Sequence, residues 1–104
     1  MQLSEVDLFF TEHPLKESYF SFSETERAGT LAVAERDVRA VTAGCSFQGE
    51  QLEFFQAAIA EQTIFLLLNP EYLTGTAAPV TGARTEALLK PLLAFRSQIT
   101  INRG

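Results

Sequence analysis

One long apolar segment constrains the fold of this chain more than any other feature: residues 51–68, QLEFFQAAIAEQTIFLLL. On a period of 3.6 residues its apolar side chains cover most of the circumference of a helix, so we expect other segments to pack around it. The helix would be roughly 27 Å long, the span of a small domain. Its unbroken apolar run is far shorter than the roughly 20 residues that cross a bilayer. The segment therefore predicts a central core helix and not a membrane span, and Asn69 followed by Pro70 predicts where it ends.

The same period predicts which side chains of this helix are buried. Apolar positions form two adjoining stripes, widened by Ala57, Ile64 and Leu67, so few positions remain for water. The stripes comprise Leu52, Phe55, Ile59 and Leu66 on one line, and Phe54, Ala58 and Phe65 on the other. The positions predicted to face water are Glu53, Gln56, Ala60 and Gln62 or Thr63.

A second helix is predicted from about residue 24 to residue 42. Ser23 and Glu26 have the spacing of a capping box, and Gly44 is the expected C-terminal stop. Because the link 44–49 is short, we expect the two long helices to form an antiparallel hairpin. The predicted buried side comprises Leu31, Ala34, Val38 and Val41, with Glu35, Arg36, Asp37 and Arg39 mostly outside.

The N-terminal region predicts a short helix, from about residue 5 to residue 11. Ser4 followed by acidic residues is typical of a helix N-terminus. This helix would turn Val6, Phe9 and Phe10 inward. The segment 15–22 is ambiguous between a turn of helix and an extended link.

The C-terminal third predicts a loop, a helix and a strand-like end. Turn-forming residues predict a long loop at about 70–84, followed by a helix at about 86–95 that Pro91 interrupts. Residues 97–102 alternate polar with β-branched apolar side chains, and no other segment offers a partner strand. The 104 residues have room for one domain and hardly two. The prediction is an all-α helical bundle at 1–96 with an extended C-terminal tail at 97–104.

Charge is unevenly distributed along the chain. Residues 1–83 hold twelve acidic and four basic side chains, a net −8, whereas residues 84–104 hold four basic side chains against one acidic, a net +3. This polarity favours head-to-tail contact between copies, although a solvated surface is the commoner meaning of such a split. Because the body is anionic, only the tail could contact phosphate, and its three positive charges at residues 90–103 predict weak, salt-sensitive binding to nucleic acid at most.

Groups for catalysis are scarce. His13 is the sole imidazole, and we interpret it as a surface histidine near a helix end. A single cysteine, Cys45, allows no internal disulfide and no zinc cluster, and its pairing with His13 is only an arithmetic possibility. No glycine-rich phosphate loop occurs. We therefore predict no catalytic residue, no cofactor and no metal, and the acidic start of the chain predicts no signal peptide.

The order of the segments carries a family resemblance. A short acidic start, LSEVDLFF, precedes a capped helix, FSETERAGTLAVAERDVRAV, and a central helix with FQAAIAEQTIFLLLN. This combination resembles small head–tail connector (adaptor or head-completion) proteins of tailed bacteriophages, over roughly residues 4–69. The chain departs from that pattern in its short link 44–49 and in having no tryptophan. The matching positions are Ala34, Glu35, Arg36, Asp37 and Val38, then Ala58 to Gln62, Ile64, Leu66 and Leu67.

The resemblance implies a structural virion protein and not an enzyme. Such subunits form a homo-oligomeric ring, commonly of twelve, between the portal protein and a tail or stopper protein, and DNA passes through without sequence-specific binding. Made in the host cytoplasm, the subunit would be located at the head–tail interface of the virion, away from membranes. By hypothesis, Ile99 and Ile101 anchor the tail on a neighbouring chain while Arg96 and Arg103 pair with its acidic residues.

Two alternatives remain open. A small cytoplasmic helical partner-binding protein, such as a secretion chaperone or an antitoxin-like module, would share the acidic charge and the lack of an active site. An enzyme would have to rely on His13 and Cys45 alone.

Overall fold

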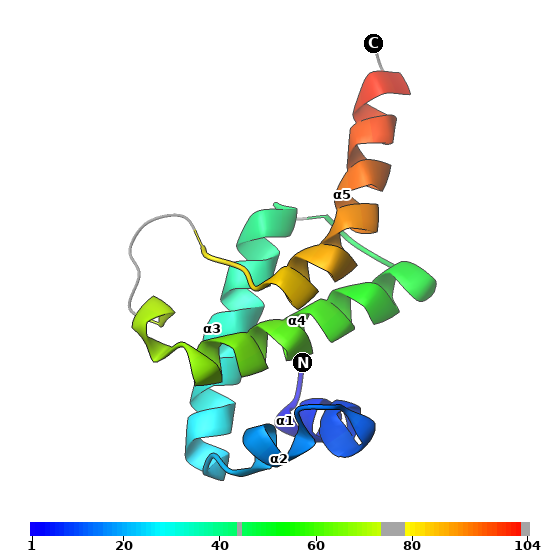
Figure 1. The fold of residues 1–104 in the computed structure, drawn as a ribbon. Helices are drawn as coiled ribbons and strands as arrows, with labels where there is room; N and C mark the ends of the chain where they lie inside the picture. Colours follow the sequence, from blue (N-terminus) through cyan, green and yellow to red (C-terminus); the bar gives the residue numbers. More distant parts are fainter. Residues whose placement is uncertain (44, 74–78, 103–104) are drawn as a thin grey trace.

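Helix α4 (Glu50–Leu68) lies at the centre of the computed structural model, which describes residues 1–43, 45–73 and 79–102, with only the course of the backbone for 94–102. Helix α3 (Glu24–Thr42) and helix α5 (Ala83–Asn102) both pack on α4 (Figure 1). Over the described residues the chain is helical and contains no strand, which confirms the all-α prediction. Within the same ranges, no helix combines the length and apolarity that crossing a bilayer requires.

The second predicted helix has the expected bounds, because its N-terminal cap is local. The Glu26 backbone N–H donates to Ser23 Oγ and the Ser23 N–H donates to Glu26 Oε1, both at 3.1 Å. The left-handed residue that stops α3 is Ala43, at φ 49°, one position before the predicted glycine. Gly44 itself lies outside the described residues.

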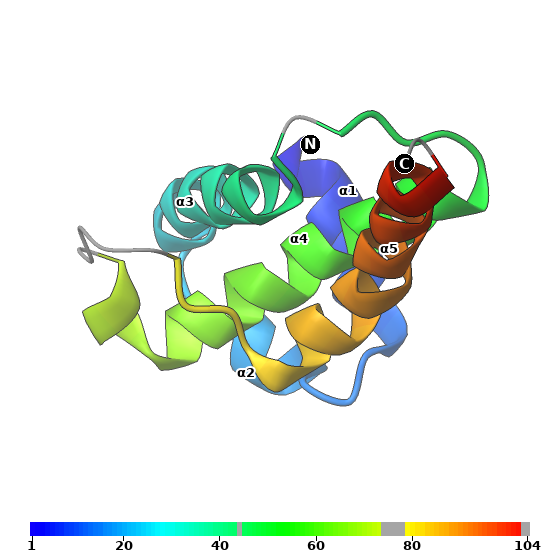
Figure 2. The same cartoon turned by 90° about the horizontal axis from the view of Figure 1, so that it is seen from above.

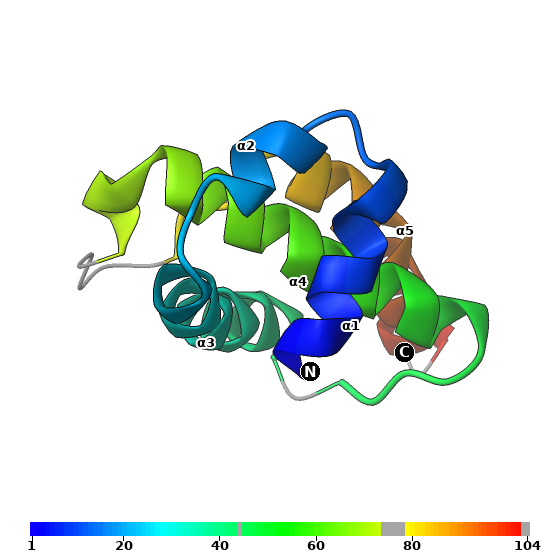
Figure 3. The ribbon, with the colours of Figure 1, turned by 90° about the horizontal axis from the view of Figure 1, so that it is seen from below.

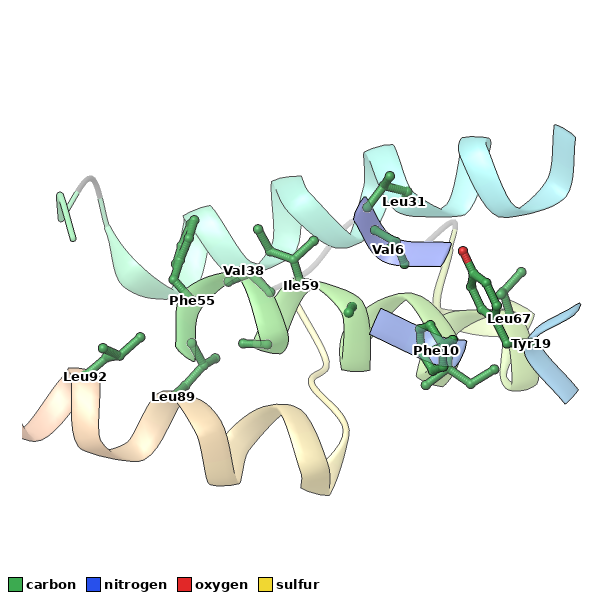
Figure 4. Close-up of a cluster of buried hydrophobic side chains, with 13 residues drawn as sticks. Val6, Phe10, Tyr19, Leu31, Val38, Phe55, Ile59, Leu67, Leu89 and Leu92 are labelled. Carbon is green, nitrogen blue, oxygen red and sulfur yellow. The ribbon is translucent and has the colours of Figure 1, made fainter. Parts of the chain in front are cut away.

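The core lies where α4 meets its neighbours. Figure 4 shows α3 and α4 running in opposite directions, with Val38 and Ile59 between them, and Figure 1 shows that the two helices cross obliquely. From the other side, Leu89 and Leu92 of α5 point toward α4 (Figure 4). All four of these side chains are at most 2 % exposed, so the central helix is held from both sides.

The exposure pattern along α4 differs from the predicted stripes. Gln62 and Thr63, predicted to face water, are fully buried, whereas Leu52 and Phe54 are each 40 % exposed. The cause is tertiary: other segments enclose the middle of the helix, residues 58–64, on every side, while its first turns are covered less completely. Asp37 of α3, predicted to be outside, is also buried, at 5 % exposure.

The N-terminal region folds into three short helical pieces that cover α4 from below in the view of Figure 1. They are α1 (Leu3–Phe9), a 3-10 turn η1 (Phe10–Glu12) and α2 (Lys16–Phe20), so the ambiguous segment is helical. The predicted Ser4 cap is wrong, because Gln2 caps α1 and completes a capping box with Glu5. Val6 and Phe10 are fully buried as predicted.

Helix α5 overturns the prediction of an extended tail. It begins three residues before the predicted start and continues through Pro91 to Asn102, across the predicted domain boundary at residue 96. The alternating pattern at 97–102 spans fewer than two helical turns and follows a helix already formed, so propagation, one hydrogen bond per residue, outweighs a weak β preference. Figure 1 shows the last turns of α5 extending beyond the bundle, and Figure 2 shows these turns from above.

The loop before α5 is only partly described. A 3-10 turn, η2 (Pro70–Tyr72), follows α4 directly, and residues 79–82 lead into α5 without regular structure. Residues 74–78 of the predicted loop at 70–84 lie outside the described part of the chain. Because α5 begins at Ala83, the loop ends slightly earlier than predicted.

Candidate functional site

The residues predicted to contact a partner lie at the end of α5. Arg96, Ile99 and Ile101 belong to the helix, although their side chains, and all of Arg103, lie outside the described residues. On a helix Arg96 and Ile99 are about one turn apart. Ile101 is two positions from Ile99 and falls on another face, so the two isoleucines do not share a face as they would in a strand.

His13 is buried and not a surface residue as predicted. Its side chain is 5 % exposed, and its Nδ1 accepts a hydrogen bond of 2.9 Å from the Leu15 backbone N–H. That bond places the proton of the neutral ring on Nε2, which donates to Glu61 Oε1 at 2.5 Å. With both ring nitrogens engaged inside the fold, His13 connects the N-terminal pieces to α4.

Glu61 is the buried carboxylate at the centre of this cluster. Its side chain is 4 % exposed, although it lies in the most apolar helix of the chain. Arg84 Nε lies 2.8 Å from Glu61 Oε2, close enough for an ion pair, yet no hydrogen bond of good geometry reaches this oxygen within the described residues. The Arg84 side chain is 57 % exposed, so the pair is accessible from the solvent side. Neither Glu61 nor Arg84 was predicted from the sequence to be a site residue.

Cys45 offers no second group to this cluster. It lies half-buried in the link between α3 and α4, and its backbone N–H donates to the Thr42 carbonyl oxygen at 3.2 Å. The histidine nitrogens that a reactive thiol would need are bound to Glu61 and Leu15. Nor does any group of three or more His, Cys, Asp or Glu side chains with metal-binding geometry occur in the described ranges.

A second polar cluster holds the N-terminal helices on α3. The Tyr19 hydroxyl and Arg27 Nη1 each donate to Asp7 Oδ1 at 2.6 Å. The Arg27 guanidinium also lies 5.3 Å from the ring centroids of both Tyr19 and Phe20, a cation–π geometry. Burial, followed by the hydrogen bond to Asp7, raises the pKa of Tyr19 far above its ordinary value, so the phenol remains protonated. This cluster is structural.

A third cluster, around Gln62, ties the start of α5 to the core. The Gln62 side-chain amide donates to the Val80 carbonyl oxygen at 2.9 Å and accepts from the Gly82 N–H at 3.3 Å. The same Nε2 lies 3.4 Å from Asp37 Oδ2. One fully buried side chain thereby joins α3, α4 and the segment before α5, and fixes where α5 begins.

Two open hollows lie side by side along α4, one between α1 and α4 and the other between the N-terminal pieces and the start of α5. Their volumes are about 490 and 450 Å³, and Phe9 and Ala57 line both. Figure 3, seen from below, shows α1 in front of α4 and α5 behind it. We call the combined feature the α1–α5 groove; its other lining residues are Met1, Glu5, Leu8, Glu53 and Gln56 at one end, and His13, Glu61, Arg84, Ala87 and Leu88 at the other.

The α1–α5 groove is apolar along its length and acidic at its ends. Leu8, which lines it, is 72 % exposed, the largest exposure among the described large hydrophobic side chains that are exposed. Glu5 and Glu53 stand at one end and Glu61 at the other, against the single guanidinium of Arg84. The N-terminal amino group at the first end is already paired with Glu35 at 2.9 Å. Such a surface suits an apolar, cationic partner.

Known proteins contribute no relative to this picture. Comparison of the chain with models of protein families, with curated proteins and with solved structures finds no match. The resemblance to connector proteins therefore remains a prediction from the order of the segments. Function is inferred from the residues of this chain alone.

Proposed function

We propose that this chain is a structural assembly protein, a head–tail connector (adaptor) subunit of a tailed bacteriophage. Copies of it form a ring that joins the portal protein to a tail or stopper protein and lets DNA pass. The subunit acts by binding and not by catalysis, and it needs no cofactor.

The observation that carries this proposal is the projecting end of α5. Its last turns extend beyond the bundle (Figure 1), and residues 84–104 hold a net charge of +3 while the rest of the chain holds −8. A cationic helix that leaves an anionic body supports contact with another protein molecule, because opposite charges steer encounter and set orientation.

The state of the sole histidine supports a binding role over an enzymatic one. A general base needs a ring nitrogen within reach of a substrate proton. Both nitrogens of His13 are occupied by Glu61 and by the Leu15 N–H, and the ring is almost wholly buried. The exposed α1–α5 groove is in contrast open to a partner.

The passage of DNA is supported by charge. Binding to duplex DNA depends on Lys and Arg side chains that neutralise phosphates, and an anionic wall repels the phosphate backbone. With twelve acidic side chains in residues 1–83, a channel formed by the body of the subunit would not retain the genome.

The direct test is assembly with the portal protein encoded by the same phage or prophage. We expect the purified full chain, mixed with that portal, to add a ring of density to one end of the portal in negative-stain electron microscopy. Truncation after Phe95 removes the last turns of α5, and the truncated chain is expected to remain folded but leave portals bare. A full chain that leaves portals bare while correctly folded contradicts the proposal.

The groove also favours a second candidate, a small cytoplasmic partner-binding protein of the secretion-chaperone or antitoxin type. Such a protein would bind one helix of a client in the α1–α5 groove and form a dimer or a one-to-one complex. Light scattering after size exclusion separates the two, because a portal-dependent ring has many subunits.

A further inference from the structure

We infer that the α1–α5 groove receives the last turns of α5 from a second copy of this chain. The inference rests on the proposed assembly role and names the contact that would join neighbouring subunits. It follows from the shape of the groove, from its charge and from the direction in which α5 leaves the bundle.

The groove has the form of a helix-binding surface. Its two hollows adjoin at Phe9 and Ala57, and the small side chain of Ala57 on the floor leaves room for an approaching backbone. Leu8 of α1 lines one hollow and Leu88 of α5 lines the other. An amphipathic helix inserts its apolar side chains into such a groove at positions one turn apart.

Charge selects the end of α5 as the occupant. The groove carries Glu5, Glu53 and Glu61 against the guanidinium of Arg84. The end of the chain supplies Arg96 and Arg103 and no acidic residue beyond Glu86. Phe95 and Ile99 are apolar residues four positions apart, and such positions fall on one face of a helix.

One carboxylate oxygen in the groove has Arg84 nearby but no well-aligned donor among the described residues. Glu61 Oε2 accepts no hydrogen bond of good geometry within the described residues, although the side chain is 4 % exposed. A buried carboxylate oxygen is stabilised by a donated hydrogen bond, and an arginine entering the groove supplies up to five N–H donors. A cationic partner side chain would therefore complete the cluster of His13, Glu61 and Arg84.

The occupant must come from another molecule. The last turns of α5 leave the bundle on the side opposite to α1, as Figure 1 shows, so they point away from the groove of their own chain. A segment that projects from one side of a subunit and a groove on another side make a heterologous contact. Repetition of such a contact closes a ring when the rotation between subunits permits.

Site-directed disulfide formation tests this contact. In a Cys45→Ser background, one variant carries Ala57→Cys on the groove floor and a second carries Ile99→Cys near the end of α5. Each chain then has one thiol, so a mixed dimer under oxidised glutathione reports contact between copies. A matched control pair replaces Ala57→Cys by Ala32→Cys, which lies on the exposed side of α3. We expect the mixed dimer of the Ala57→Cys and Ile99→Cys chains to form several-fold faster than the mixed dimer of the control pair.

A surface variant checks that the groove is responsible. Leu8→Lys, added to the Ala57→Cys chain, removes an exposed apolar side chain and places a cation where a cationic helix must bind. We expect it to slow mixed-dimer formation about fivefold. Because Leu8 is 72 % exposed, thermal unfolding should be unchanged, which excludes misfolding as the cause. Ala28→Lys, which adds the same single positive charge at an exposed position of α3 outside the groove, serves as the control and should have little effect.

The outcomes separate this inference from the proposed function. Mixed dimers that form no faster than the Ala32→Cys control overturn the groove contact, even if the full chain still adds density to portals. A strong preference for the groove pair in a chain that leaves portals bare supports the contact and overturns the connector role. Equal cross-linking with and without Leu8→Lys also contradicts the inference, because it assigns the contact to another surface.

Discussion

Gln62→Leu measures how much the buried amide in the middle of α4 contributes to the fold. The two side chains have similar volumes, so the substitution leaves no large cavity. It removes the donor to the Val80 carbonyl and the acceptor of the Gly82 N–H. Val80 lies at an exposed position, where water can reach its carbonyl oxygen, but Gly82 is buried and its N–H is left without a partner.

The expected loss of stability follows from these groups. An unsatisfied buried donor costs about 1–3 kcal/mol, and losing the long contact to Asp37 adds up to about 1 kcal/mol. Burying a leucine in place of an amide returns about 1 kcal/mol. The net effect is a free energy of unfolding lower by about 2 kcal/mol, or a melting temperature lower by roughly 10 °C for a domain of this size.

Urea unfolding followed by circular dichroism provides the assay, with Gln56→Leu as the matched control. Gln56 lies on the same helix, is only half-buried and makes no hydrogen bond among the described residues, so its replacement should change stability by less than about 0.5 kcal/mol. If Gln62→Leu proves as stable as the wild type, Gln62 faces water as its sequence pattern predicts, and the described packing of α4 is wrong.

Three further perturbations test the other parts of the fold. A Cβ at Gly82 would lie 2.7 Å from Phe65 Cδ1, so Gly82→Ala should lower the free energy of unfolding by about 1–3 kcal/mol. Thermal unfolding measures this loss, and an unchanged melting temperature would mean that the contact between Gly82 and Phe65 is looser. His13→Ala leaves Glu61 Oε1 without its donor and should cost about 2–3 kcal/mol in urea, whereas a surface histidine would cost almost nothing. The N-terminal amino group lowers the pKa of Glu35 below its ordinary 4.5. The Glu35 carboxylate therefore stabilises the fold above about pH 4.5, and this stabilisation is lost as the pH falls through the pKa of Glu35 in the folded state. The urea midpoint of the wild type should accordingly fall more steeply below about pH 4.5 than that of Glu35→Gln, and parallel curves would argue against the pairing.

Local signals made the long helices predictable. The box formed by Ser23 and Glu26 needs only residues within one turn, so its pattern predicts the start of α3 correctly. The apolar density of residues 51–68 likewise predicts α4 to within one residue. At the N-terminus the same reasoning selected Ser4, but Gln2 and Glu5 have the same spacing and form the box instead.

Contacts between segments distant in the sequence explain why the other predictions were wrong. Helical periodicity assumes that one face of a helix meets water, and α4 has no such face at residues 58–64, so the pattern misassigned Gln62. In the same way, the alternation at 97–102 is a strand signal only for a chain that is free to extend, and a helix already formed continues through it.

The sequence indicated only one member of the cluster of His13, Glu61 and Arg84. A glutamate in the middle of an apolar stripe must be paired if it is buried, so Glu61 carried a signal that a partner exists. Nothing in the pattern indicated that His13 and Arg84, 48 and 23 positions away, would supply it. The same limit applies to the α1–α5 groove, because its walls come from opposite ends of the chain.

Complementarity between the anionic body and the cationic end of α5 is tested most directly by sedimentation velocity of the untagged full chain. The structure predicts that the sedimentation coefficient rises with protein concentration at about 0.05 M salt, and that about 0.5 M salt reverses the rise by screening the charges. A single species of 11.5 kDa at every concentration and both salt levels would contradict head-to-tail assembly.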